Sequence, residues 1–211
     1  EVRNPLSSIG LNVEMLGDAL ARASFRTEGE PREARELLAA VTREVDRLTD
    51  ITEQYLRMAR PPKPTLVSED VTEVLGGVLD FSRQELERAG VEVVREFAPD
   101  TPRVLADEGQ LRQVFLNLVR NSREAMPTGG RHTVSTRGLE KEVEITVQDT
   151  GRGMTEAVRA RLFEPFFSTK EGGTGLGLSV SQEILHSHGG TLACQSQSGQ
   201  GTTFVLRLPR A

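Results

Sequence analysis

A proline-rich stretch, Arg60-Pro61-Pro62-Lys63-Pro64, divides the chain into two regions with different hydrophobic patterns. Proline cannot continue a helix and disfavours helix in the residue before it, so a helix arriving from the N-terminal side must end here. Before this stretch, apolar residues recur at alternating intervals of four and three. After it, helical periods are mixed with the period of two that is typical of strands. The sequence therefore predicts two domains, 1–60 and 66–211, joined by a linker at 61–65.

The N-terminal region has the narrow apolar seam of a coiled coil or helix bundle. The seam runs from Val2, stops at the polar stretch Ser24–Glu30, and resumes at Leu38. We expect two helices that form an antiparallel hairpin, which by itself buries only one stripe. Dimerisation into a four-helix bundle would cover the second face. The alternative is a helical appendage packed on its own domain.

The second region combines helices and strands. The predicted helices are Val71–Ala89, Gln110–Met126 and Leu176–His188, and the predicted strands are Val91–Phe97, His132–Arg137, Val143–Gln148, Thr191–Gln197 and Thr202–Leu208. Helices interspersed with largely antiparallel strands predict an α+β sandwich with the helices on one face. Only 4% of the residues are aromatic and none is Trp, so we expect a mostly aliphatic core.

Composition excludes several classes of protein. The formal net charge of -5 argues against a nucleic-acid partner, which would need a basic face. The single cysteine, Cys194, excludes an internal disulfide and is consistent with a reducing compartment. No apolar run approaches the roughly 20 residues of a membrane span. We therefore expect a cytoplasmic fragment of a longer protein, without membrane contact of its own.

Two asparagines share one face of the predicted helix Gln110–Met126. Asn117 and Asn121 are four residues apart and project together. Asparagine is a mediocre helix former, so the pair invites an explanation. An amide oxygen suits Mg²⁺ that also holds phosphate oxygens. A pair of surface amides is the alternative.

A carboxylate followed by spaced glycines ends the predicted strand Val143–Gln148. In Asp149-Thr-Gly-Arg-Gly153, glycine allows a flat ligand to approach the backbone closely. The Asp149 carboxylate could accept from an exocyclic amino group such as that of adenine. A tight turn is the alternative, because Asp and Gly are common in turns.

The segment between this motif and the last helix contains an aromatic box and a glycine-rich loop. Three phenylalanines lie within Leu162–Phe167, and Gly172–Leu178 runs directly into a helix. Glycines before a helix N-terminus expose backbone N–H groups to an anion such as phosphate. Lys170 lies between the two elements, in a segment that could form a lid over a nucleotide.

The amide pair, Asp-x-Gly-x-Gly, the aromatic box and Gly-x-Gly-x-Gly, in this order, resemble the ATP-binding domain of the GHKL superfamily, the Bergerat fold. The stretch FFSTKEGGTGLGL and the preceding hairpin resemble a sensor histidine kinase of two-component signalling, most similar to the nitrogen-regulation type. The resemblance spans nearly the whole chain. It implies that the domain binds ATP and Mg²⁺.

The resemblance also implies roles for individual residues. It makes Asp149 the adenine-reading residue and Asn121 the Mg²⁺ ligand. In hydrolysing relatives a glutamate that activates water stands in the place of Asn117. The residues it implies for nucleotide binding are Asn117, Asn121, Asp149, Gly151, Gly153, Phe163, Phe166, Lys170, Gly173, Thr174, Gly175, Leu176 and Gly177.

The chain opens with Glu1 to Pro5, which resembles the phosphoacceptor motif His-Glu-x-x-Asn/Thr-Pro without its histidine. We expect the acceptor histidine immediately before Glu1. The resemblance makes Glu1 the base for that histidine and makes Asn4 a residue that orients water for dephosphorylating a partner. From these residues alone, without the ATP-binding motifs, the favoured interpretation is that Glu1 is a helix N-terminal charge and Asn4-Pro5 a cap pair.

None of the three histidines in the chain replaces the missing acceptor. His186 and His188 precede Gly189, which predicts an ordinary helix stop. His132 begins a predicted strand and has no obvious partner.

The resemblance implies a dimeric protein-histidine kinase that uses ATP and releases ADP. Phosphate would pass from the histidine to an aspartate on the receiver domain of a response regulator, with possible phosphatase activity on that regulator. One alternative is a nucleotide-binding module for dimerisation and docking, without autokinase activity. Another is a GHKL ATPase of a different branch.

Overall fold

The computed structural model describes Val13, Glu36, residues 38–42, Val45, and residues 63–170 and 173–211. The chain divides into two compact units, Glu1–Arg60 and Pro61–Ala211. The described residues of the first unit are all helical. The predicted hairpin, its loop and the four-helix bundle otherwise fall outside the described residues.

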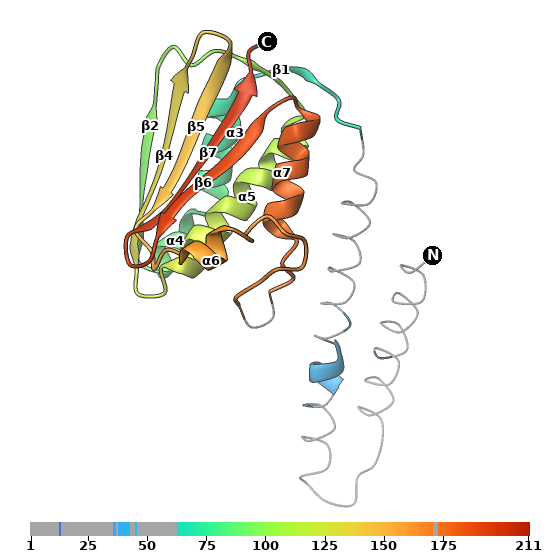
Figure 1. The fold of residues 1–211 in the computed structure, drawn as a ribbon, viewed down its shortest axis with the longest axis vertical. Coiled ribbons are helices and arrows are strands. Elements are labelled where there is room, and N and C mark those ends of the chain that lie inside the picture. Colours follow the sequence, from blue (N-terminus) through green and yellow to red (C-terminus); the bar gives the residue numbers. More distant parts are fainter. Residues whose placement is uncertain (1–12, 14–35, 37, 43–44, 46–62, 171–172) are drawn as a thin grey trace, which may run out of the picture. The chain divides into compact units, whose positions relative to one another are not determined.

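The second unit is built on a five-stranded sheet with the order β2-β4-β5-β7-β6 (Figure 1). Its strands are β2 (Val91–Phe97), β4 (Gly130–Gly138), β5 (Glu142–Asp149), β6 (Thr191–Gln197) and β7 (Gly201–Pro209). β2 runs parallel to β4, whereas the other three neighbouring pairs are antiparallel. The prediction of a largely antiparallel sheet is confirmed.

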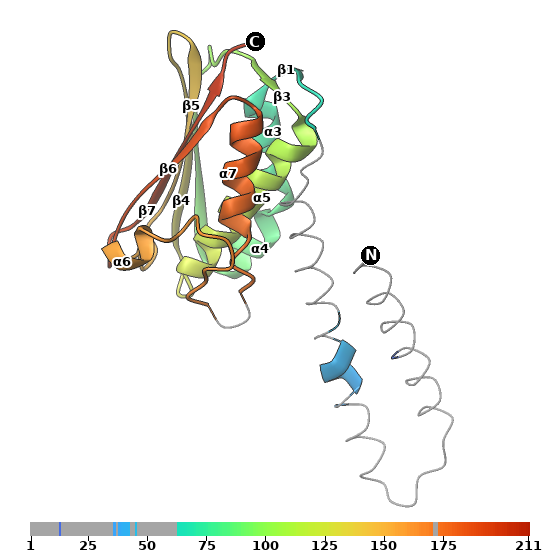
Figure 2. The same cartoon turned by 45° about the vertical axis from the view of Figure 1, so that its right-hand side comes forward.

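Helices cover one face of this sheet, as predicted. Figures 1 and 2 show α3, α5 and α7 side by side against it. The helices of the unit are α3 (Val71–Phe81), α4 (Arg83–Arg88), α5 (Glu108–Ala125), α6 (Glu156–Arg159) and α7 (Gly177–Ser187). α5 begins after Asp107, whose carboxylate accepts the Gln110 N–H at 3.0 Å and caps the helix.

The core lies between the helices and the sheet and is mostly aliphatic. β5 buries Val143, Ile145 and Val147, which alternate along the strand as the period of two requires. α5 buries its apolar face with Phe115 at the centre, and Phe115 is only 1% exposed. This packing fixes the polar face of α5 and the C-terminal end of β5, where the predicted ligand-binding residues lie.

The structure corrects several predicted elements. Strands β1 (Val67–Glu69) and β3 (Val104–Ala106) form a separate antiparallel pair that the sequence analysis missed. Three residues are too few to display an alternating pattern. The predicted helix Val71–Ala89 is divided at Ser82, whose N–H bonds to the carbonyls of both Asp80 and Val78. α6 was also missed, because it is only four residues long.

No helix in the described part of the chain is long and apolar enough to cross a membrane.

Candidate nucleotide-binding site

The Asp149 side chain lies almost fully buried at the end of β5, with 3% of its surface exposed. Its Oδ1 accepts the Gly151 N–H at 2.8 Å. Burial raises the pKa of the Asp149 carboxyl, and it outweighs the hydrogen bonds from the Gly151 and Thr202 backbone N–H groups, which act in the opposite direction. A carboxylate can accept about four hydrogen bonds, so it has capacity for one further donor, such as the amino group of a purine.

Three glycines allow the backbone to close around Asp149. A Cβ on Gly151 would lie 2.7 Å from the Ala125 carbonyl oxygen at the end of α5. Gly153 has φ +61, and a Cβ there would lie 2.0 Å from the carbonyl oxygen of Gln197. Gly201 was missed by the sequence analysis. It has φ +86, and its Cβ would lie 2.0 Å from the carbonyl oxygen of Asp149 itself. Its only sequence signal is the turn between β6 and β7.

The two asparagines of α5 project together, as their spacing predicts. Asn121 Nδ2 lies 3.5 Å from Asn117 Oδ1, at the limit of a hydrogen bond. Asn117 Nδ2 donates to the Ser181 hydroxyl on α7 at 3.0 Å. A Cβ on Gly177 would lie 2.4 Å from Asn117 Oδ1, so this glycine lets α7 start directly against Asn117. Ser181 was not among the predicted residues.

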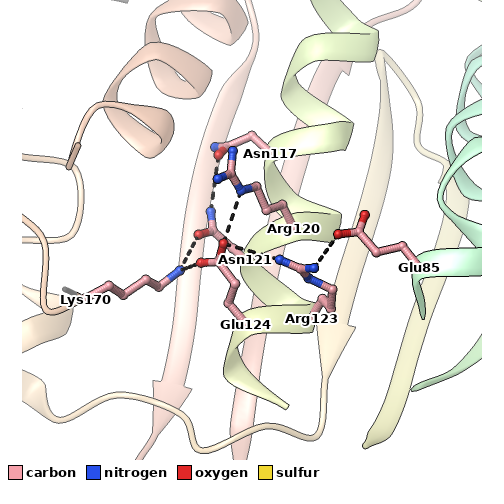
Figure 3. Close-up of polar contacts among 7 residues, drawn as sticks. All are labelled: Glu85, Asn117, Arg120, Asn121, Arg123, Glu124 and Lys170. Carbon is pink, nitrogen blue, oxygen red and sulfur yellow. Dashed lines mark hydrogen bonds and ion pairs between the residues drawn. The ribbon is translucent and has the colours of Figure 1, made fainter. Parts of the chain in front are cut away.

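Lys170 reaches α5 from the segment before the glycine-rich loop (Figure 3). Its ammonium donates to Asn121 Oδ1 at 2.9 Å and to the carboxylate of Glu124. Glu124 also pairs with Arg120 at 3.1 Å and with Arg123 at 3.7 Å. Burial raises the pKa of the Glu124 carboxyl, but the hydrogen bonds and charges of Lys170 and Arg120 outweigh it and lower the pKa overall. Glu124 was missed, although it follows Asn121 by three residues on the same helix face.

The predicted aromatic box lies in a segment without regular structure between α6 and α7. Phe163 is partly buried, whereas Phe166 is 55% exposed. Phe166 has a φ of 65°, a left-handed conformation that is uncommon for an aromatic residue. Gly175 fits against it, because a Cβ there would lie 2.4 Å from the Phe166 carbonyl carbon. The structure therefore packs the glycine loop against the aromatic box.

The glycine-rich loop leads into α7 with no side chain capping the helix N-terminus. Leu176 precedes the helix and is fully buried, and its N–H lies 3.4 Å from the Thr174 hydroxyl. Gly173 packs on Ser168, whose Oγ would lie 2.3 Å from an added Cβ. The first N–H groups of α7 are thus positioned for an anion, since a helix N-terminus carries partial positive charge.

Glu1 and Asn4 lie outside the described residues. His188 ends α7, as predicted for a helix stop, and it also links two elements. Its Nδ1 donates to the Ile184 carbonyl at 2.7 Å, and its Nε2 accepts the Asp107 N–H at 3.0 Å.

His132 is fully buried, and neither ring nitrogen has a hydrogen-bond partner within the described chain. It lies opposite Asp149 in the β4–β5 register. Burial lowers the pKa of His132 to about 4.

The donor set around Asn121 fits Mg²⁺ bound together with phosphate. Among the described residues no cluster of three or more His, Cys, Asp or Glu side chains could hold a metal by itself. Mg²⁺ in nucleotide sites takes only one or two protein ligands beside phosphates and waters. A hard amide oxygen beside the Glu124 carboxylate meets that requirement, and Asn121 Oδ1 already faces a cation, the Lys170 ammonium.

Two family models match the chain. The model for "Histidine kinase-, DNA gyrase B-, and HSP90-like ATPase" matches residues 106–211, and the model for "His Kinase A (phospho-acceptor) domain" matches residues 1–63.

The chain is similar along 99% of its length to two curated kinases. It is 36% identical over 210 residues to the sensor histidine kinase ZraS of Klebsiella oxytoca, and covers 44% of that protein. It is 32% identical over 210 residues to sporulation kinase E of Bacillus subtilis, and covers 27% of it. The chain thus spans less than half the length of these relatives.

Among solved structures, full-length ShkA in complex with AMPPNP aligns with a TM-score of 0.75 at 26% identity. The alignment covers 99% of this chain and 46% of ShkA. The predicted resemblance to sensor histidine kinases is therefore confirmed, whereas the nitrogen-regulation subtype stays a prediction.

Proposed function

The chain belongs to the histidine kinase-, DNA gyrase B- and HSP90-like ATPase family and has the domain pair of the two-component sensor histidine kinases, and we propose that it is their catalytic core. Residues 66–211 bind Mg-ATP. Residues 1–60 form the dimerisation and phosphotransfer domain, joined by the linker at 61–65. The observation that carries the proposal is the buried Asp149 carboxylate enclosed by glycines.

Asp149 recognises the adenine ring in this proposal. A purine amino group donates to the carboxylate, which must be ionised to accept it fully. Gly151 and Gly153 let the chain pack closely beside this carboxylate, because a Cβ at either position would collide with backbone. The AMPPNP bound to ShkA supports nucleotide binding by this fold.

The phosphates lie at the N-terminus of α7 and beside Asn121. The loop formed by Gly173, Thr174, Gly175, Leu176 and Gly177 holds them through backbone N–H groups, and the aromatic box of Phe163 and Phe166 supports this loop. The N–H groups of Gly173 and Leu176 must first leave the Lys170 carbonyl and the Thr174 hydroxyl. Asn121 would hold Mg²⁺, which would supply positive charge against the phosphate oxygens. Asn117 cannot take a proton from water, which suits a site that transfers phosphate to protein instead of hydrolysing ATP.

The reaction is phosphoryl transfer to histidine. An imidazole nitrogen forms a bond to the γ-phosphorus while the bond from that phosphorus to the β–γ bridging oxygen breaks, and ADP leaves. Glu1 takes the proton from the other ring nitrogen. The acceptor histidine is the residue expected immediately before Glu1.

The phosphate then passes to an aspartate on the receiver domain of a response regulator. The regulator docks on a homodimeric bundle formed by residues 1–60, in the cytoplasm. Asn4 orients water for a separate reaction, dephosphorylation of the regulator. These partners and the phosphatase activity rest on the phospho-acceptor domain match at residues 1–63.

A calorimetric titration with Mg-ADP tests the nucleotide site. Asp149→Asn should weaken binding at least about 100-fold, because one charged hydrogen bond in a buried pocket is lost and a second donor faces the purine amino group. Asp100→Asn, at an exposed position in the loop after β2, is the matched control and should bind like the wild type. Unchanged affinity in Asp149→Asn would refute the assignment.

Incubation with labelled ATP tests the kinase activity. The chain extended by its upstream histidine should become labelled, and the same chain with that histidine changed to Gln should not. Labelling of neither form, with intact nucleotide binding, would favour the docking module. Rapid ATP hydrolysis without a partner would favour an ATPase of another branch.

A further inference from the structure

A lysine ammonium occupies the amide oxygen that the proposed function gives to Mg²⁺. Lys170 Nζ lies 2.9 Å from Asn121 Oδ1 and also bonds to Glu124 (Figure 3). The contact joins residues 49 positions apart in the chain, so it depends on the fold and not on local sequence. Both side chains are about two-thirds or more buried, with 32% and 27% exposed.

An ammonium and a magnesium ion cannot both bind this oxygen without strong repulsion between them. A ligand bond to Mg²⁺ is about 2.0–2.1 Å long. An ammonium on the same oxygen would therefore lie within about 5 Å of a doubly charged ion, where like charges repel strongly in a half-buried site. Binding of the metal must move Lys170 away from Asn121.

Glu124 is the anion that keeps Lys170 in place. The carboxylate is ionised, because hydrogen bonds and charges from Lys170 and Arg120 outweigh the effect of burial on its pKa. Arg120 is 75% exposed and contributes a screened contact. When the lysine leaves, Glu124 remains three residues from Asn121 on the same face of α5, where its carboxylate would be available to a hydrated metal ion.

We propose that Lys170 is the resident cation of the Asn121 site before Mg-nucleotide binds, and that Glu124 holds first this lysine and then the hydrated metal. Lys170 exchanges Asn121 for phosphate oxygens when nucleotide enters. Neither residue takes part in the chemical step; both set how strongly nucleotide affinity depends on Mg²⁺. This inference rests on the proposed function.

The measured quantity is the magnesium enhancement, the dissociation constant for ADP in EDTA divided by that in excess Mg²⁺. Lys170→Met removes the competing cation and a phosphate partner, so the enhancement should rise at least about fivefold. Glu124→Gln removes one negative charge, and this loss weakens the binding of a divalent ion more than the contact with the monovalent ammonium. The enhancement should therefore fall in that variant. Lys141→Met, an exposed lysine in the turn between β4 and β5, is the matched control and should match the wild type.

A second measurement tests the contact without nucleotide. The side-chain NH₂ resonances of Asn121, assigned with Asn121→Ser, should shift in Lys170→Met and in Glu124→Gln but not in Lys141→Met. They should also shift when Mg-ADP is added to the wild type. This readout does not depend on activity, and thermal unfolding of each variant checks that it folds.

Different results would refute the proposed function and the inference about Lys170 and Glu124. If the wild type does not bind ADP, or Asp149→Asn binds it normally, the proposed function is wrong. If the wild type binds ADP but Lys170→Met and Glu124→Gln leave both the enhancement and the Asn121 resonances unchanged, only this inference is overturned. An equal change of both dissociation constants, which leaves the enhancement constant, also overturns it.

Discussion

Gly153→Ala tests whether the loop after Asp149 depends on glycine for space as well as for backbone conformation. At φ +61 an alanine pays the cost of the left-handed region, about 1 kcal/mol. Its Cβ would also lie 2.0 Å from the carbonyl oxygen of Gln197, a backbone atom that no rotamer change can move. Displacing that strand end adds about 2–3 kcal/mol, as overpacking in a tight site does. The total loss of unfolding free energy is about 3–4 kcal/mol.

Two other glycines separate these contributions. Gly199 has φ +78, and no atom lies within 4 Å of a Cβ added there. Gly199→Ala should therefore lose only the conformational contribution, about 1 kcal/mol of unfolding free energy. Gly76 lies inside α3, also with nothing within 4 Å, and Gly76→Ala should stabilise by about 0.5–1 kcal/mol.

The assay is thermal unfolding of the second unit by calorimetry. For about 150 residues, 1 kcal/mol shifts Tm by roughly 2–4 °C. Gly153→Ala should therefore lower Tm by about 10 °C and Gly199→Ala by about 3 °C, while Gly76→Ala should raise it by about 2 °C. The folded fraction of Gly153→Ala should also bind ADP more weakly, because Gly153 packs on Gln197 and Gly201, and Gly201 packs on Asp149. Equal losses in Gly153→Ala and Gly199→Ala would refute the steric argument.

Two further predictions concern buried side chains. The pKa of His132 is lowered to about 4 in the folded state, whereas the unfolded chain takes up this proton near pH 6.5. The contribution of neutral His132 to the free energy of unfolding is therefore complete above pH 6.5 and is lost as pH falls toward 4. The full loss is about 3 kcal/mol. In urea unfolding between about pH 7 and 4.5, the free energy of unfolding of His132→Leu should depend less steeply on pH than that of the wild type. Parallel plots of this free energy against pH would contradict the prediction. Phe115→Ala at the centre of α5 should cost about 3–5 kcal/mol in the same assay, whereas the exposed Phe81→Ala should cost under about 1 kcal/mol. Similar losses at these two positions would contradict the packing described for the core.

The long elements of the fold could be predicted because each has a clear period. α5 repeats its apolar residues on one face, and β5 and β7 alternate along each strand. The short elements could not. β1 and β3 are defined by pairing with each other, Val67 with Ala106 and Glu69 with Val104, and three residues carry no readable pattern. Ser82 divides a helix at a residue compatible with either state.

The sequence named residues of the candidate site, whose role stays a prediction, but it could not give their contacts. Asp149, Asn117 and Asn121 were recognisable because polar residues at those places have no role in a core. Glu124 and Ser181 were not, because a charged residue on a helix face and a serine within a helix are ordinary in any sequence. Their roles depend on which distant side chains the fold brings to them, Lys170 and Asn117 respectively.

Those contacts change how the site should be understood. Asn117 already bonds to Ser181, and Asn121 already bonds to Lys170. In the proposed function, incoming phosphate and metal exchange with these partners. Nucleotide affinity then depends on the difference between the polar contacts formed in the complex and those given up by the free protein. A residue that touches no nucleotide atom, such as Glu124, can therefore alter affinity by stabilising the set that is given up. For the same reason, variants of the site are informative only when both the free and the bound protein are measured.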